Sequence, residues 1–173
     1  MNTLDAIKAR HSTRGFSDRQ VSDADLEAIL FAGGQAAVGA ADFKSMKLYV
    51  VQDPALLKDI DEVSARRRPG SHPLYGAPTL VVLASKQSIL PYIEYTNAGC
   101  VIQNMMVAAA DLGVDSIYLW MSMYGINEDP ELVKRLGFPE GFTCVGTMAL
   151  GYEAKEFPKV KADEQRIEVA YIR

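Results

Sequence analysis

The sequence predicts an α+β protein in which helices flank a central sheet, built as one domain over residues 1–173. Stretches with apolar residues at helical spacing alternate with short apolar runs that are typical of strands. The 173 residues, 49% of them hydrophobic, suffice for one well-packed core and are too few for two comfortable ones. No internal repeat and no linker rich in Pro, Gly or Ser divides the chain.

The first half of the chain predicts three helices and two strands. Apolar spacing, N-cap residues such as Ser22, and breakers such as the Gly33 and Gly34 pair predict helices over residues 3–9, over 22–34, and from Pro54 to the turn that begins at Arg66. Strands are expected over residues 46–52 and 78–85. The second strand is a continuous apolar run, so we expect it to be buried on both faces.

The second half opens with the longest predicted helix, residues 94–113, which is apolar almost all round. Such a helix belongs in the middle of a structure or against a second subunit. The sequence then predicts a strand over 114–120, a helix over 129–136 with Asn127 as a plausible cap, a strand over 142–151 and a strand-like tail over 167–173.

Charge and composition narrow the class of protein. A net charge of −4 and a pI near 5.2 argue against a nucleic-acid surface. The polar start and the absence of any apolar run near the roughly 20 residues of a membrane span predict a cytoplasmic protein that binds no membrane. Cys100 and Cys144 lie in apolar runs without partners at metal or redox spacing, which predicts two buried free thiols.

Residues 10–14, Arg-His-Ser-Thr-Arg, form a candidate anion site. They lie where the first helix stops, so Arg10 and Arg14 can converge on one phosphate while Ser12 and Thr13 donate neutral hydrogen bonds. An ordinary solvated basic patch is the alternative.

A second basic run, Arg66 to Arg68, is interpreted as a solvated loop, with a mobile basic rim over an anionic substrate as the alternative. His72 has no acidic or Cys neighbour at ligand spacing, so we expect no metal there. Gly-x-Gly-x-x-Gly, Walker and Gly-x-Ser-x-Gly motifs are absent. If the protein is an enzyme, a bound cofactor therefore carries its chemistry.

Four segments in order resemble the nitroreductase family of flavoproteins. They are IKARHSTRGF at 7–16, APTLVV at 77–82, NAGCVIQNMM at 97–106, and LGFPEG at 136–141 with ALGY at 149–152. The resemblance implies a nitroreductase-like sandwich with a central mixed sheet and an intertwined homodimer that holds FMN at the subunit interface. It also implies reduction by NADH or NADPH and reoxidation by nitroaromatics, quinones or related acceptors in a ping-pong cycle, without a catalytic side chain or a metal.

The resemblance also implies roles for individual residues. Arg10, His11, Ser12 and Arg14 match the flavin-binding segment, and Lys159 and Lys161 match a late basic pair that closes on the same phosphate. Leu119, Trp120 and Met121 match the part near the flavin ring, although Trp120 also fits plain core. Asp42 and Lys44 replace the family's usual Asn and Gln. An Asp cannot donate as an amide does, whereas Lys44 would place a positive charge near the reduced flavin's N1 and O2.

Three further interpretations remain open from the sequence. The chain could be an FMN-binding carrier or sensor with little turnover, or a specialised ene reductase or dehalogenase of the same fold. It could also be an obligate dimer with a degenerate site, for which Asp42 is the best supporting feature.

Overall fold

A computed structural model of the chain describes residues 1–88, 90–155 and 166–173. Its centre is a four-stranded sheet in the order β1-β2-β4-β3. The strands are β1 (Met46–Val51), β2 (Thr79–Lys86), β3 (Asp115–Tyr118) and β4 (Phe142–Gly151). The α+β class is confirmed, but the sheet is not mixed among the strands described. Each pair of neighbouring strands runs in opposite directions, so all of these pairings are antiparallel.

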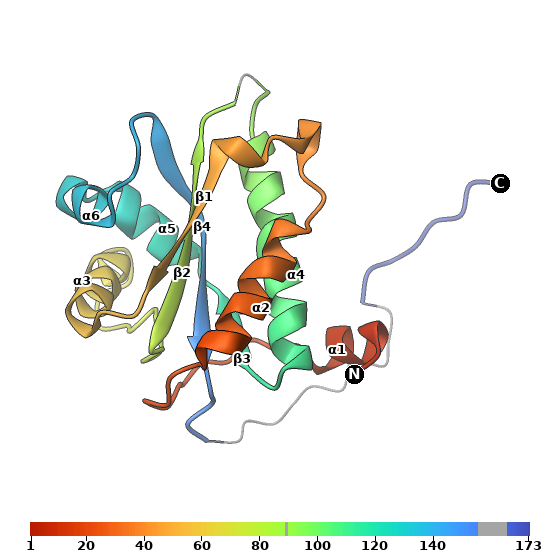
Figure 1. Cartoon of the computed structure of the whole chain (residues 1–173), viewed down its shortest axis with the longest axis horizontal. Helices are drawn as coiled ribbons and strands as arrows, with labels where there is room; N and C mark the ends of the chain where they lie inside the picture. Colours follow the sequence, from red (N-terminus) through yellow and green to blue (C-terminus); the bar gives the residue numbers. More distant parts are fainter. Residues whose placement is uncertain (89, 156–165) are drawn as a thin grey trace.

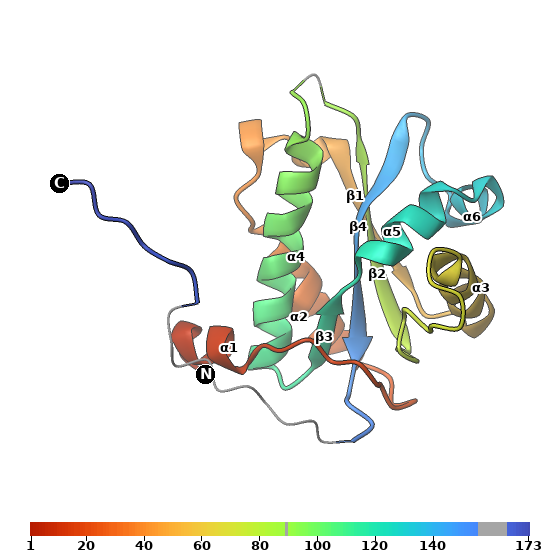
Figure 2. The same ribbon diagram turned by 180° about the vertical axis from the view of Figure 1, so that it is seen from behind.

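Helices cover both faces of this sheet (Figures 1 and 2). On one face lie α3 (Pro54–Ala65), α5 (Trp120–Asn127) and α6 (Pro130–Leu136). On the other lie α2 (Asp23–Gly34) and the long α4 (Ile93–Asp111), and α1 (Thr3–Ala9) lies beside the C-terminal end of α4. Among the described residues, no helix has both the length and the apolar character needed to cross a membrane.

The strand β2 is buried on both faces, as predicted. Leu80 and Val82 join the core beneath α3 and α5, whereas Val81 and Leu83 join the core beneath α2 and α4. Side chains alternate along a strand, so consecutive apolar residues supply both layers at once. The continuous apolar run is explained by this double burial.

The helix caps follow the sequence with one exception. The Ser22 hydroxyl accepts a hydrogen bond from the Asp25 amide at 3.1 Å, and Asp53 caps α3 through the Leu56 amide at 2.7 Å. Asp129 rather than Asn127 caps α6, accepting from Leu132 at 3.2 Å. The Asn127 side chain is used elsewhere, because it makes two 2.8 Å hydrogen bonds with the backbone of Cys144 in β4.

Two strand predictions were wrong. The strand predicted over 114–120 ends at Tyr118, and Trp120 already begins α5, a helix that the sequence did not indicate. The described tail, residues 166–173, forms no strand and extends away from the body (Figures 1 and 2). Its apolar side chains are exposed, Ile172 by 99%, because no other part of the described chain pairs with it.

The cysteine prediction holds for one residue of two. Cys144 is buried in the core between β4 and the α3 layer, and this burial raises the pKa of its thiol to about 12. Cys100 is exposed, contrary to the prediction. It lies on the outward face of α4, which the apolar composition of that helix concealed.

Candidate functional site

The segment that follows α1 is held against the edge strand β3 by backbone hydrogen bonds. The Thr13 amide donates to the Ser116 carbonyl at 3.1 Å, and the Ser17 amide donates to the Tyr152 carbonyl at 2.8 Å. Between these anchors, the Gly15 carbonyl accepts from the Ala154 amide at 3.0 Å. Residues 10–17 are therefore fixed on both sides, by β3 and by the chain that leaves β4.

This anchoring separates inward from outward side chains. Thr13 is only 1% exposed and faces the core, whereas its neighbours Ser12 and Arg14 are half-buried and exposed. Arg14 donates from Nη1 to the Ser12 carbonyl at 3.4 Å, which holds the guanidinium beside the loop backbone. Arg10 is half-buried at the C-terminal cap of α1. The structure thus presents cations and the Ser12 hydroxyl on a fixed backbone. The predicted role of Thr13 as a donor to the anion was wrong, because its side chain is buried and its hydroxyl contacts His11.

The His11 ring is turned toward its own chain. Its Nδ1 lies 3.1 Å from the Ala9 carbonyl, and its Nε2 lies 3.2 Å from the Thr13 hydroxyl and 3.5 Å from the Asp115 carboxylate. Both ring nitrogens are thereby engaged. The sequence could not show this, because Asp115 lies more than a hundred positions further along the chain.

The junction of β3 and α5 carries the three residues predicted near the flavin ring. Leu119 is buried, and its backbone is fixed to Thr147 of β4 by the amide at 2.9 Å and by the carbonyl, which accepts from the Thr147 hydroxyl. Met121 is half-buried. Trp120 is 45% exposed, so the core interpretation of this residue was wrong.

Aromatic rings surround Trp120. Its ring stacks on Tyr118 with centroids 6.2 Å apart and an interplanar angle of 22°, and it meets Tyr124 edge-on at 5.8 Å. Partial burial raises the pKa of the Tyr118 phenol, which therefore keeps its proton at neutral pH. Together the three rings form an aromatic cluster at the end of the edge strand, with the Trp120 ring partly exposed.

Asp42 and Lys44 lie in a different place. Asp42 lies between two short 3-10 turns, Gly39–Ala41 and Phe43–Ser45, Lys44 lies within the second, and both side chains are exposed. The Gly39 amide donates to the Asn97 side chain at 2.9 Å, which ties this turn to the first turns of α4. A Cβ at Gly39 would lie 2.5 Å from the end of the Ile93 side chain, which would then have to move.

The predicted site is therefore divided between the two ends of α4 (Figures 1 and 2). Arg10 and His11 share a cavity of about 260 Å³ with Ala110 and Gly113 at the C-terminal end. Asp42 shares a cavity with Ile93 and other residues of the N-terminal end. The 19 residues of α4 span about 28 Å at 1.5 Å per residue. One chain does not bring these two groups together, and Lys159 and Lys161 lie outside the described residues.

The arginines that follow α3 have structural partners. Arg66 pairs with Asp129 at 2.8 Å, and Arg67 pairs with Glu128 while its guanidinium lies 4.6 Å from the centre of the Tyr124 ring. They form a surface loop, as the favoured interpretation held, but an ion-paired one that joins α3 to the α5–α6 junction. His72 is also paired, with Asp61 at 3.0 Å, although the sequence showed no acidic neighbour for it.

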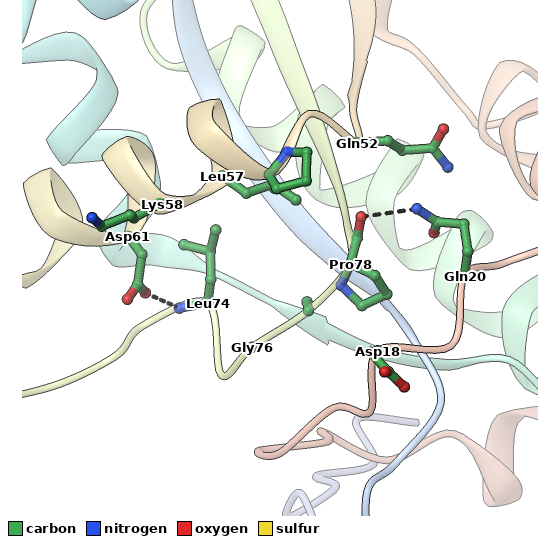
Figure 3. A pocket seen from close by; sticks show the side chains of 11 residues that line it. Asp18, Gln20, Gln52, Leu57, Lys58, Asp61, Leu74, Gly76 and Pro78 are labelled. Carbon is green, nitrogen blue, oxygen red and sulfur yellow. Dashed lines mark hydrogen bonds between the residues drawn. The ribbon is translucent and has the colours of Figure 1, made fainter.

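A larger hollow of about 430 Å³ lies beside α3, and none of the predicted site residues that the structure describes lines it (Figure 3). Gln20 donates to the Pro78 carbonyl at 3.2 Å, and Asp61 accepts from the Leu74 amide at 2.8 Å. These polar groups serve to hold the loops of the hollow in place.

The loop of the candidate site is held in place by residues that the sequence did not indicate. Ser116, Thr147 and Tyr152 position the site through backbone groups or a buried hydroxyl, and the Tyr75 carbonyl accepts from the Phe16 amide at 3.0 Å. Any residue type can make such backbone contacts, so the sequence does not indicate them. They become visible only in the strand pairing of the folded chain.

Fold and site together define an α+β protein with a cationic loop fixed to the edge of an antiparallel sheet. The chain belongs to the nitroreductase family, whose model matches residues 7–152.

Individual relatives agree with this assignment. The chain is 30% identical over 164 residues to an Archaeoglobus fulgidus protein assigned by name to the NADH dehydrogenase/NAD(P)H nitroreductases, covering 94% of this chain and 91% of that protein. The crystal structure of a nitroreductase with bound FMN from Desulfitobacterium hafniense superposes with a TM-score of 0.86 at 25% identity, covering 99% of this chain and 100% of that one. A Bacteroides fragilis nitroreductase with bound FMN gives 0.80 at 28% identity, with 99% and 100% covered.

Proposed function

We propose that this protein is an FMN-dependent oxidoreductase that takes reducing equivalents from NADH or NADPH and passes them to nitroaromatics, quinones or related acceptors in a ping-pong cycle. The observation that carries the proposal is the fixed loop of residues 10–17, which presents Arg10, Ser12 and Arg14 beside the edge strand. The FMN bound in the Desulfitobacterium and Bacteroides relatives and the name of the Archaeoglobus relative support it.

The side chains of this loop fit the phosphate of FMN. A phosphate monoester carries close to two negative charges and offers three acceptor oxygens, and guanidinium groups bind such oxygens in pairs. Arg10 and Arg14 supply this charge within a protein whose net charge is −4, and Ser12 adds a neutral donor. His11 belongs to the same loop in this proposal, with its ring directed at the Ala9 carbonyl, the Thr13 hydroxyl and the Asp115 carboxylate of its own chain.

When bound, FMN supplies the hydride chemistry, and the protein's share is positioning and electrostatics. The fixed Leu119 backbone and the exposed Trp120 ring provide a planar apolar surface on which flat ring systems can stack and from which they displace water. Lys44 provides a positive charge for the pyrimidine edge of a ring that becomes negative on reduction.

The site is complete in this proposal only in a homodimer. Because Arg10 and Asp42 lie at opposite ends of α4, a two-fold dimer that pairs α4 antiparallel to its copy brings one end of each chain against the other end of its partner. Apolar side chains that a partner would cover are exposed on this side of the chain, on α1, α2 and α4: Leu4, Ile7, Phe31, Tyr95 and Leu112.

Absorption spectroscopy tests the proposal. Purified protein should be yellow or take up added FMN, and NADH or NADPH should bleach the flavin band until a quinone or nitroaromatic is added. Arg14→Ala should weaken FMN binding by about tenfold or more, since it removes a charge-assisted phosphate contact. Arg135→Ala, which removes a surface arginine paired with Asp59 at 2.6 Å, is the matched control. Protein that binds no FMN would overturn the proposal.

A further inference from the structure

Three potential metal ligands meet where the loop after α1 crosses β3. His11, Asp115 and Glu153 each offer one ligand atom, and these atoms all lie within 4.8 Å of one another. They come from distant segments of the sequence: the loop, the first residue of β3 and the chain that follows β4. The side chains of His11 and Asp115 are only 26% and 17% exposed. Within residues 1–88, 90–155 and 166–173, no second group of this kind occurs.

Hydrogen bonding fixes the orientation of the His11 ring. The Ala9 carbonyl can only accept, so the Nδ1 atom 3.1 Å away is the donor. In the neutral ring, Nε2 then carries a lone pair, and it is this atom that faces Asp115 and the Thr13 hydroxyl. Histidines that bind metals in proteins almost always donate their other ring N–H to a carbonyl, a carboxylate or water in this way.

The Asp115 carboxylate and the backbone segments that carry Glu153 and His11 are also held in place. Asp115 accepts from the Glu153 amide through Oδ2 at 2.8 Å, which leaves Oδ1 directed at His11. A β-bridge between Phe16 and Glu153 and the Thr13 to Ser116 hydrogen bond fix the segments that carry Glu153 and His11. These contacts fix the backbone of the three ligands, so only side-chain movement is needed to bring the ligand atoms around an ion.

The separation between His11 and Asp115 suits a shared metal ion as well as a direct ion pair. His11 Nε2 and Asp115 Oδ1 are 3.5 Å apart, which exceeds the 2.7–3.2 Å range of N–H···O hydrogen bonds in proteins. Ligands bound tetrahedrally to Zn²⁺ at about 2.1 Å lie about 3.4 Å from each other. The His11–Asp115 separation is close to this value, and the wider spacing within the group, up to 4.8 Å, must shorten when an ion binds.

We propose that His11, Asp115 and Glu153 bind a divalent transition-metal cation of the zinc class. One imidazole and two carboxylates suit Zn²⁺, Co²⁺ or Mn²⁺, and the two negative charges match the charge of the ion. Three protein ligands leave a fourth position, which opens to the 260 Å³ cavity that Arg10 also lines. Water or an anionic oxygen can occupy that position. Nothing in this proposal requires FMN.

Calorimetric titration with Zn²⁺ and visible absorption of the Co²⁺ form test the proposal on the full-length protein after dialysis against a chelator. Both use a Cys100→Ser background, because an exposed free thiol can bind zinc on its own. One ion should bind per chain, and Asp115→Asn and Glu153→Gln should each weaken binding by about tenfold or more. His72→Ala removes the other histidine, which is paired with Asp61, and should leave binding unchanged.

The proposal would be overturned if the parent protein did not bind zinc. It would also be overturned if the two carboxylate variants bound zinc as tightly as the parent protein. Thermal melting curves establish that each variant is folded, and Asp115→Asn keeps an oxygen that can still accept from the Glu153 amide. FMN uptake is measured separately on the same samples. Failure to bind zinc with FMN binding intact refutes only the metal site, whereas the reverse result refutes only the flavin proposal.

Discussion

At the scale of single residues, Gly125 marks the closest approach of two helices. A Cβ at this position of α5 would lie 2.8 Å from the Ser64 amide nitrogen and 2.9 Å from its Cα, both backbone atoms of α3. Backbone cannot move aside as the end of a flexible side chain can. The contact explains why a helix interior tolerates a glycine here despite its low helix propensity.

Gly125→Ala should therefore lower the free energy of unfolding by about 1–3 kcal/mol, the usual cost of an overpacked contact. Urea denaturation followed by circular dichroism measures this change. Gly34→Ala is the control, because a Cβ at Gly34 meets nothing within 4 Å. That variant should stay within about 0.5 kcal/mol of the wild type. Equal stability of the two variants would show that α3 and α5 are not in such close contact.

The two thiols should differ in reactivity. Because burial raises the pKa of Cys144 to about 12, its nucleophilic thiolate is almost absent at pH 8. A Cys100→Ser variant should fail to react with a disulfide reagent in the native state and should release one equivalent of chromophore in guanidinium. Cys144→Ser, which keeps the exposed Cys100, is the comparison. Rapid labelling of native Cys144 would contradict the buried position.

At the scale of elements, α6 depends on the charge of its cap. The Leu132 amide, and after it Arg66, lowers the pKa of the Asp129 carboxyl below its usual 3.8. A carboxyl with a lowered folded pKa stabilises the folded state above its unfolded pKa, and this contribution is lost as pH falls through the folded value. Asp129→Asn should retain a capping oxygen but lose the charge.

The stability gap between wild type and Asp129→Asn should consequently be largest near neutral pH and should close as the pH falls below 3.8. Urea midpoints measured from pH 7 down to pH 3 follow this gap. Asp59→Asn serves as the control, since Asp59 pairs with Arg135 on the surface and caps no helix. A gap that stays constant across this range would mean that the Asp129 charge contributes nothing.

Elements with a clear period and a cap were predictable, and those defined by tertiary contact were not. The apolar run of β2 and the caps Ser22 and Asp53 follow from local chemistry alone. α5 was missed because its first residues, Trp120 and Met121, resemble a continuing strand and its helical state depends on packing against α3. Asn127 was misassigned because its partner, Cys144, is distant in sequence.

At the scale of the whole molecule, the sequence predicted which residues belong to the candidate site but not how they are arranged in space. The pattern of residues 10–14 predicted an anion site, and in the structure Arg14 is exposed and Ser12 half-buried. The same pattern could not show that Asp42 lies at the other end of α4. Only the folded chain shows that α4 separates these two groups, which is why we propose a site shared between two copies.

Subunit mixing tests this arrangement directly. An Arg10→Ala/Arg14→Ala variant damages one half of every proposed site, and an Asp42→Ala/Lys44→Ala variant damages the other half. Each homodimer then has two defective sites. In a mixed dimer, both lesions fall in one site and the second site is intact, because each site takes one half from each chain. Random exchange makes about half of the dimers mixed, so about a quarter of all sites should recover FMN binding. Fluorescence titration with FMN before and after denaturation and joint refolding measures this recovery, and each variant refolded alone is the control. If all parts of the site came from one chain, joint refolding would restore no binding.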